Sequence, residues 1–297
     1  MYLAHVGGPV FEPLQVAVLT LVATAYSLRA INLSQENRPV PSWRLICFAS
    51  GLALIAIAFV SPLGRIDDEL VLAHMGQHLL MGDVGPLLLV LGLTGPLLQP
   101  LLANRWLGWL RHLAHPLVAL PLWAADLFIW HVPVLYQAAT EHSAIHALQH
   151  SCFIGFGVLM WMPLLGPLPK PKWFEIPAKI GYLIGVRLIG TVLANVFMWS
   201  NSVFYPHYAA GEASWHIAPL TDQSIAGVIM MVEGGFVTLG VLVWLFLQWA
   251  QQDTERQRLL DLADSRGVPL SDARAARAAA AGQGARLEER IKTEGSS

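Results

Sequence analysis

The chain has 297 residues, of which 55% are hydrophobic and only 13% are charged, with a formal net charge of −2 and a mean hydropathy of +0.52. A soluble globular protein carries about 25% charged residues, so this composition excludes an ordinary soluble domain and is typical of a polytopic membrane protein. The sequence contains no phosphate-binding loop, nucleophile elbow or nucleotide signature. We expect no catalysed reaction and no nucleic-acid partner.

Apolar segments long enough to cross a lipid bilayer follow one another up to residue 250. A membrane-spanning helix needs about 20 mostly apolar residues, and strands are disfavoured because these runs are long and lack alternation. The seven predicted spans cover residues 11–31, 43–63, 69–93, 115–133, 143–164, 176–200 and 221–249. The sequence therefore predicts an all-α bundle of seven transmembrane helices over residues 1–250. A polar tail, residues 251–297, is expected to be partly disordered or helical.

The distribution of Lys and Arg predicts the orientation of these spans. Basic residues gather in the first, third and fifth connecting loops, and the C-terminal tail carries eight of them. The N-terminal tail has none, and neither do the fourth and sixth loops. Because cytoplasmic loops are enriched in Lys and Arg, we expect the N-terminus outside and the C-terminus in the cytoplasm.

The third predicted span carries two histidines, His74 and His78, in its outer half. An ionisable side chain inside a bilayer is costly and is a functional candidate by default. Residues three or four apart share one face of a helix, so Met81 belongs to the same face as both histidines. Imidazole suits copper, zinc and iron, while thioether sulfur favours Cu(I). This face therefore predicts most of a Cu(I) ligand shell.

The fifth predicted span repeats this pattern, with His142, His146 and His150 at fourfold spacing. It also enters from the outside, and His131 ends the fourth span on that side. A single histidine in a helical bundle is more often hydrogen-bonded structure than a metal ligand, and His142 is expected at the water interface. The second repeat on the same side favours ligation, and we expect the two histidine stripes to face each other. The predicted metal ligands are His74, His78, Met81, His131, His146 and His150.

Charged residues deep in other spans form a second set of candidates. Asp83 and Arg187 lie near the middle of the third and sixth spans, so their matched depth and opposite charge predict a salt bridge. Glu233 is similarly deep in the seventh span, and Asp126 is placed to orient a histidine through a hydrogen bond. The buried polar residues expected around the site are Asp83, Asp126, Arg187, Asp222, Gln223 and Glu233.

Three segments resemble a known family. The runs HMGQHLLMGDVGPLLLVLG, HALQHSCFIGFGVLMWMPLLGP and YPHYAAGEASWHIAPLTDQSIAGVIMMVEGG resemble the signature regions of CtaG-like cytochrome c oxidase assembly factors. The resemblance covers roughly residues 10–250, and Asp83 departs from it at a position expected to be apolar. It implies a multi-pass protein of the bacterial plasma membrane that takes part in maturation of caa-type haem–copper oxidases. Oxidase subunits or copper chaperones are then the expected partners, besides the lipid bilayer.

Three functions remain open at this point. The interpretation that we favour is an assembly factor that holds or delivers copper at the outer face of the membrane. A membrane b-type cytochrome is an alternative, because His78 and His150 sit on different helices as bis-histidine haem ligands do. A copper or proton-coupled transporter is another, with Met81, Met230 and Glu233 along its path.

Overall fold

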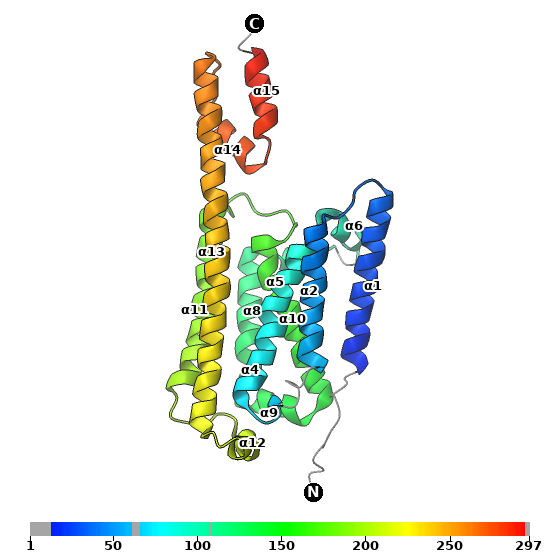
Figure 1. Cartoon of the computed structure of the whole chain (residues 1–297), viewed down its shortest axis with the longest axis vertical. Helices are drawn as coiled ribbons and strands as arrows, with labels where there is room; N and C mark the ends of the chain where they lie inside the picture. The colour runs from blue at the N-terminus through cyan, green and yellow to red at the C-terminus, as the bar shows by residue number, and fades with distance from the viewer. Residues whose placement is uncertain (1–12, 61–65, 107, 295–297) are drawn as a thin grey trace. The chain divides into compact units, whose positions relative to one another are not determined.

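The computed structural model describes residues 13–60, 66–106 and 108–294, and every regular element among them is helical (Figure 1). Residues 11–12 of the first predicted span and 61–63 of the second lie outside the described residues. The chain divides into two compact units, residues 1–237 and residues 238–297. The division falls inside one long helix, whereas the sequence suggested a boundary after residue 250.

The first unit contains the helices expected to cross the membrane. They are α1 (Pro13–Gln35), α2 (Ser42–Val60), α4 (Val71–Leu79), η1 (Leu80–Val84), α5 (Gly85–Gly92), α6 (Gly95–Ala103), α7 (Leu110–Leu113), α8 (Pro116–Trp130), α9 (Pro133–Glu141), α10 (Ser143–Leu165), α11 (Ile176–Trp199), η2 (Pro206–Tyr208), α12 (Ala209–Ser214) and the first part of α13 (Pro219–Ser265). Within the described residues, six segments are long and apolar enough to span a bilayer, and α8 with α9 makes a seventh if counted together. The predicted all-helical membrane fold is confirmed, while the side on which each terminus lies stays a prediction.

The fourth span differs from the single helix that the sequence predicted. Helix α8 ends at Trp130, and α9 starts at Pro133 with a bend of 71° between them. Proline cannot donate a backbone hydrogen bond, and it disfavours helical geometry in the residue before it. Val132 accordingly has an extended backbone. The break places His131 at the corner between the two helices.

The third span lies in the middle of the first unit, packed against α2 on one side and α10 on the other. Close approach is possible because glycines line both contacts: a Cβ at Gly51 would come within 2.9 Å of the Gly85 carbonyl oxygen, and one at Gly157 within 2.1 Å of the Gly82 oxygen. The span contains one π-helical stretch, η1, directly before Pro86. A widened turn of this kind is frequent at functional sites, and here it follows the two histidines.

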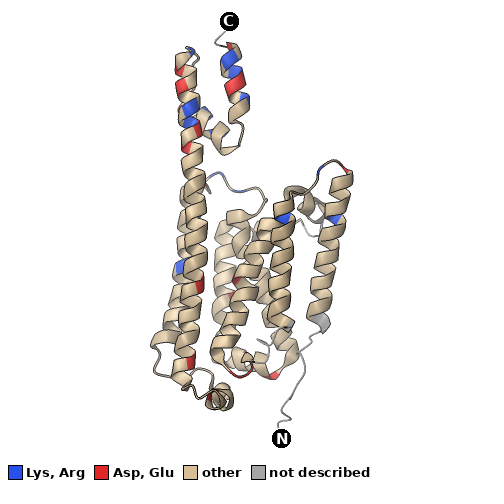
Figure 2. Ribbon diagram, in the orientation of Figure 1, with Lys and Arg blue, Asp and Glu red and all other residues tan. Residues whose placement is uncertain are grey.

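The second unit consists of the distal part of α13 with α14 (Asp272–Ala280) and α15 (Gly284–Glu294). Its own apolar core is formed by Leu259, Ala263, Ala275, Leu287 and Ile291. Figure 2 shows that the charged residues are dense in this unit and sparse along the spans. The polar tail is therefore a helical hairpin packed on a long helix.

Candidate functional site

Four histidines from two helices come together in the first unit, and we call them the four-histidine cluster: His74 and His78 on α4, His146 and His150 on α10. Within each helix the ring centroids lie 4.1 and 4.0 Å apart. Between the helices, His74 stands 6.0 Å from His146, and His78 stands 5.5 Å from His150. The prediction that the two stripes face each other is confirmed. His142, one turn earlier, is exposed, as expected for a residue at the water interface.

Three of the four imidazoles, those of His74, His78 and His150, are buried and have few hydrogen-bond partners. His74, His78 and His150 are only 3%, 6% and 2% exposed. In the described residues the Nε2 atoms of His74 and His150, and both ring nitrogens of His78, have no hydrogen-bond partner. A buried polar group without a partner costs about 1–3 kcal/mol. Such nitrogens, gathered on two facing helices, make these residues the candidate site.

His131 approaches the cluster from the corner between α8 and α9. Its Nδ1 lies 2.6 Å from the Leu127 carbonyl oxygen, and its Nε2 is buried without a partner in the described residues. With Nδ1 donating, Nε2 keeps the lone pair that a metal ligand needs. Phe153 separates it from the cluster, with ring centroids 6.0 Å from His131 and 4.6 Å from His78. Asp126, which we expected to orient a histidine, instead contacts the side chain of Trp130. The Leu127 carbonyl orients His131.

Three buried glutamines lie beside the cluster. Gln15 places its amide nitrogen 3.4 Å from His150 Nδ1, and Gln77 donates to the Ala58 carbonyl oxygen at 2.8 Å. Gln149 is 1% exposed, and neither of its amide atoms has a partner in the described residues. A glutamine side chain can both donate and accept a hydrogen bond, so it is compatible with a neighbouring imidazole in either its neutral or its protonated form. Gln15 was not anticipated from the sequence.

The position of α4 is set by an acidic side chain from α13. Asp222 is fully buried, and its two carboxylate oxygens accept hydrogen bonds from the backbone amides of Val71 at 2.7 Å and Leu72 at 3.0 Å. A helix start leaves its first amides unsatisfied, and a carboxylate there also favours the helix dipole. The next residue, Gln223, accepts from the Phe204 amide at 2.9 Å and so holds the preceding loop. Both residues act on the site through the backbone.

Tyrosines cover the end of the cluster at which His74 lies. The hydroxyl groups of Tyr136 and Tyr208 lie 2.7 Å apart, and both side chains are 1% exposed. Tyr205 stacks on Tyr136 with centroids 3.8 Å apart and donates to the His131 carbonyl oxygen at 2.9 Å. Tyr136 stands 5.0 Å from His74. These tyrosines were not predicted from the sequence. Their only signal there is that Tyr205 and Tyr208 lie close to His207 along the chain.

The loop before α4 adds a buried acid outside the spans. The pKa of Asp67 is raised to about 7, mainly by burial and to a smaller extent by the negative charge of the neighbouring Asp68. The Asp67 side chain is 4% exposed. This carboxyl therefore changes its charge near neutral pH.

Met81, the predicted thioether ligand, is fully buried in an apolar cluster with Phe48, Ile55 and Leu89. Its place there is explained by the ordinary use of methionine as a filler of core gaps. A role as metal ligand is not tested by this packing.

The predicted salt bridge between Asp83 and Arg187 is wrong. Trp161 Nε1 donates to Asp83 Oδ1 at 2.8 Å, and Arg187 Nη2 donates to the Met231 carbonyl oxygen at 2.6 Å. No ion pair joins Asp83 to Arg187 in the part of the chain that the structure describes. Depth in the membrane does not determine which helix face a residue occupies, so each side chain finds its hydrogen-bond partner elsewhere. Asp83, Arg187 and Glu233 nevertheless lie close enough to interact electrostatically.

As they stand, the described residues contain no group of three or more His, Cys, Asp or Glu side chains spaced to hold a metal ion. The four-histidine cluster is therefore best described as two facing pairs. Each pair presents imidazoles from both α4 and α10.

Comparison with known proteins gives one family. The model of the cytochrome c oxidase caa3 assembly factor family matches residues 24–252. Uncharacterised proteins of Mycobacterium bovis and Mycobacterium tuberculosis are each 26% identical over 262 residues, which is 82% of this chain and 39% of theirs. A third, from Mycobacterium leprae, is 23% identical over 262 residues, 82% of this chain and 40% of its own. The chain thus spans about two-fifths of the length of these relatives. No solved structure matches it.

Proposed function

Because the chain belongs to the cytochrome c oxidase caa3 assembly factor family, we propose that its four-histidine cluster holds copper on the way to the oxidase. The site lies at the outer face of the bacterial plasma membrane in this proposal. Oxidase subunits, or a copper chaperone that meets them, are the partners. The chain carries out no turnover reaction of its own.

The observation that carries the proposal is the pairing of imidazoles across α4 and α10. A metal ion binds imidazole nitrogen at about 2 Å, so two opposed nitrogens must stand about 4 Å apart. The ring centroids of His78 and His150 lie 5.5 Å apart, which suits this separation after rotation of the rings. His74 and His146, at 6.0 Å with nearly parallel rings, offer a second pair. Imidazole is a suitable ligand for copper, and the Nε2 atoms of His74, His78 and His150 are buried without a hydrogen-bond partner among the described residues, which leaves them available to a metal.

The same packing supports copper over the alternatives. A haem needs a wide, flat space for its macrocycle between the two axial imidazoles, whereas the rings of His74, His146 and Phe153 pack 4.0 to 4.6 Å from His78 or His150. A transporter needs polar groups that continue across the membrane. Of the residues considered for such a path, Met81 and Met230 pack in apolar clusters.

Cu(I) binding to the purified full-length protein tests the proposal. A colorimetric chelator of Cu(I) competes with the protein under anaerobic conditions, and metal analysis gives the stoichiometry. We expect His78→Ala with His150→Ala to weaken Cu(I) binding by about 100-fold or more, because it removes both ligands of one facing pair and leaves only His74 and His146 in the cluster. The same variant should lower the level of mature caa-type oxidase in cells that lack the native protein.

The matched control is His142→Ala, which removes an exposed imidazole from the same helical stripe. It should bind copper as the unchanged protein does. Equal copper binding by the double variant and the control would overturn the proposal. Stoichiometric iron with a Soret band would favour the cytochrome instead.

A further inference from the structure

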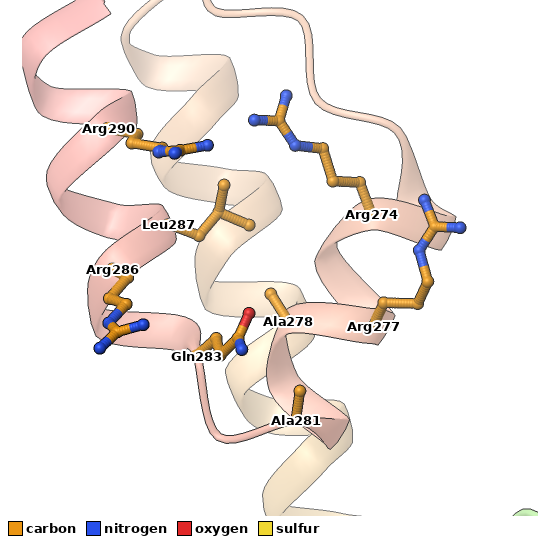
Figure 3. A pocket seen from close by; sticks show the side chains of 8 residues that line it. All are labelled: Arg274, Arg277, Ala278, Ala281, Gln283, Arg286, Leu287 and Arg290. Atoms are coloured by element: carbon orange, nitrogen blue, oxygen red, sulfur yellow. The ribbon is translucent and has the colours of Figure 1, made fainter.

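The second unit contains an arginine cavity, formed by residues of α14 and α15. It has a volume of about 430 Å³, within the range of small-ligand sites. Figure 3 shows the side chains that surround it, and its lining is Arg274, Arg277, Ala278, Ala281, Gln283, Arg286, Leu287 and Arg290. Four guanidinium groups from two helices therefore border one cavity. No acidic side chain lines it.

The four arginines are not needed to hold the unit together. All four are exposed, while the helices pack through the apolar core described above. Each of the two turns is closed by a glycine with φ of +64°, Gly267 after α13 and Gly282 after α14. At the second, the Gln283 amide donates to the Ala278 carbonyl oxygen at 2.8 Å, which is a common helix end. The backbone fixes the cavity before any ligand arrives.

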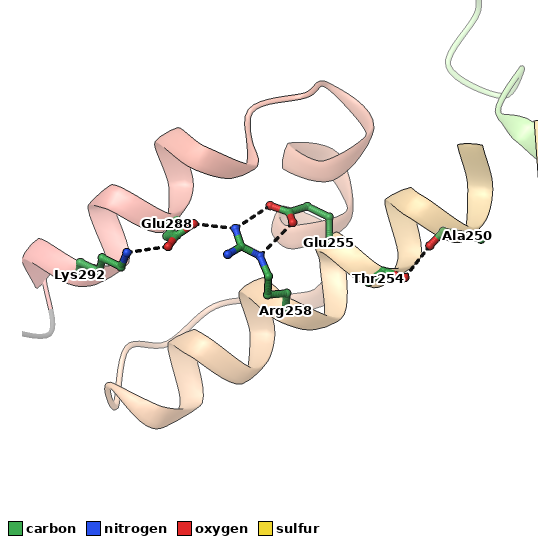
Figure 4. Close-up of polar contacts among 6 residues, drawn as sticks. All are labelled: Ala250, Thr254, Glu255, Arg258, Glu288 and Lys292. Carbon is green, nitrogen blue, oxygen red and sulfur yellow. Dashed lines mark hydrogen bonds and ion pairs between the residues drawn. The ribbon is translucent and has the colours of Figure 1, made fainter. Parts of the chain in front are cut away.

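Other basic residues of the unit form ion pairs with acidic side chains. Arg258 donates to Glu255 at 3.0 Å and to Glu288 at 2.6 Å, and Lys292 donates to Glu288 at 2.6 Å (Figure 4). Arg256 pairs with Asp253 at 2.8 Å. By contrast, no ion pair to the four arginines of the cavity occurs among the described residues. Within the described residues, these four guanidinium groups are therefore not engaged in ion pairs and remain available to a ligand.

The start of α15 is not part of this site, because the Glu255 carboxylate of α13 lies against Gly284, its first residue. The ligand is selected by the arginine side chains that line the cavity. Guanidinium groups match phosphate oxygens in pairs of parallel hydrogen bonds. Four arginines from two helices around one cavity therefore select a ligand with phosphate chemistry.

We propose that the arginine cavity binds a phosphate-bearing anion, either a soluble polyphosphate or the headgroup of an anionic phospholipid. The cavity lies near the end of the apolar part of α13. A Cβ at Gly284 would meet the Glu255 carboxylate at 2.2 Å, and Glu255 is six residues beyond Trp249, or about 9 Å along the helix. If the apolar part of α13 spans the bilayer, long arginine side chains at this distance from its end are placed to contact the lipid phosphates.

Calorimetric titration of the detergent-purified full-length protein with sodium pyrophosphate tests the proposal. Arg277→Gln with Arg286→Gln removes one guanidinium from each helix and should weaken binding by at least about tenfold, the loss expected for charge-assisted hydrogen bonds. The charge-matched control, Arg38→Gln with Arg266→Gln, removes two exposed charges elsewhere and should bind within about twofold of the unchanged protein. Thermal unfolding of each variant verifies that the fold is intact.

A second arm identifies the source of the phosphate. The protein is reconstituted in phosphatidylcholine vesicles with or without phosphatidylglycerol, and pyrophosphate binding is measured again. Weaker binding in the anionic vesicles, seen with the control and not with the cavity variant, identifies the lipid headgroup. Equal binding in both vesicles identifies a soluble phosphate. The proposal is overturned if the unchanged protein does not bind millimolar pyrophosphate, or if the cavity variant and the control lose binding equally.

Discussion

Replacement of Asp222 by alanine should loosen the histidine-bearing helix without touching a histidine. The carboxylate accepts from the amides of Val71 at 2.7 Å and Leu72 at 3.0 Å and is fully buried. An ordinary N-cap contributes up to about 2 kcal/mol, and two hydrogen bonds to a charged group contribute roughly 3–6 kcal/mol together. We expect a loss of about 3 kcal/mol, since alanine also leaves the two amides without partners.

This loss is measured as a change in Tm. For chains of 150–250 residues, 1 kcal/mol lowers Tm by about 2–4 °C, so a loss of about 3 kcal/mol should lower Tm by about 6–12 °C. The assay is thermal unfolding of the detergent-purified, metal-free protein followed by tryptophan fluorescence. Cu(I) affinity should also decrease, because His74 lies in the first turn of the helix that loses its cap.

Two further variants make the comparison specific. Asp222→Asn keeps one carbonyl oxygen as an acceptor and should lose only about half of the free energy of unfolding that Asp222→Ala loses. Asp253→Ala removes an exposed acid from the same helix, where its ion pair with Arg256 is worth at most about 1 kcal/mol. If Asp222→Ala and Asp253→Ala unfold at the same temperature, the capping argument is refuted.

Three more outcomes are expected. Burial raises the pKa of Asp67 from an ordinary 3.8 to about 7, so the folded state favours the protonated carboxyl. The free energy of unfolding should therefore be highest below about pH 4 and should fall by roughly 4 kcal/mol as the pH rises through 7. Above that pH it should stay level. The unfolding midpoint of the metal-free protein between pH 5 and 8 measures this, and Asp67→Asn should flatten the curve. Trp161→Phe removes the donor to Asp83 and should cost about 1–3 kcal/mol; a second change, Asp83→Asn, should restore part of it, and an additive loss of stability would contradict the contact. In a double-mutant cycle of Tyr136→Phe and Tyr208→Phe, we expect the double variant to be more stable than the sum of the singles by about 1 kcal/mol, and strict additivity would show that the hydroxyl groups do not interact.

The sequence by itself determined the spans and the histidine stripes. Apolar runs of this length must form helices in a bilayer because every backbone polar group has to be satisfied within the segment. The fourfold spacing of His74 with His78 and of His146 with His150 then places each pair on one face. Their common depth made a shared site a reasonable expectation. These inferences held because they depend on local periodicity and on the bilayer as solvent.

Tertiary structure decided which groups meet across the bundle. Spacing along the chain does not reveal that Asp222 caps a helix 150 residues earlier, or that Asp83 meets an indole rather than Arg187. Such partners depend on how each helix is rotated about its axis, which is set by the packing of glycines and aromatic rings from several helices at once.

The same reason applies to the C-terminal arginines. The sequence places Arg274 with Arg277, and Arg286 with Arg290, one turn apart on two helices. Only the hairpin closed at Gly282 brings the two faces to one cavity. Local spacing fixes which side chains share a helix face, and only packing between helices determines what that face meets.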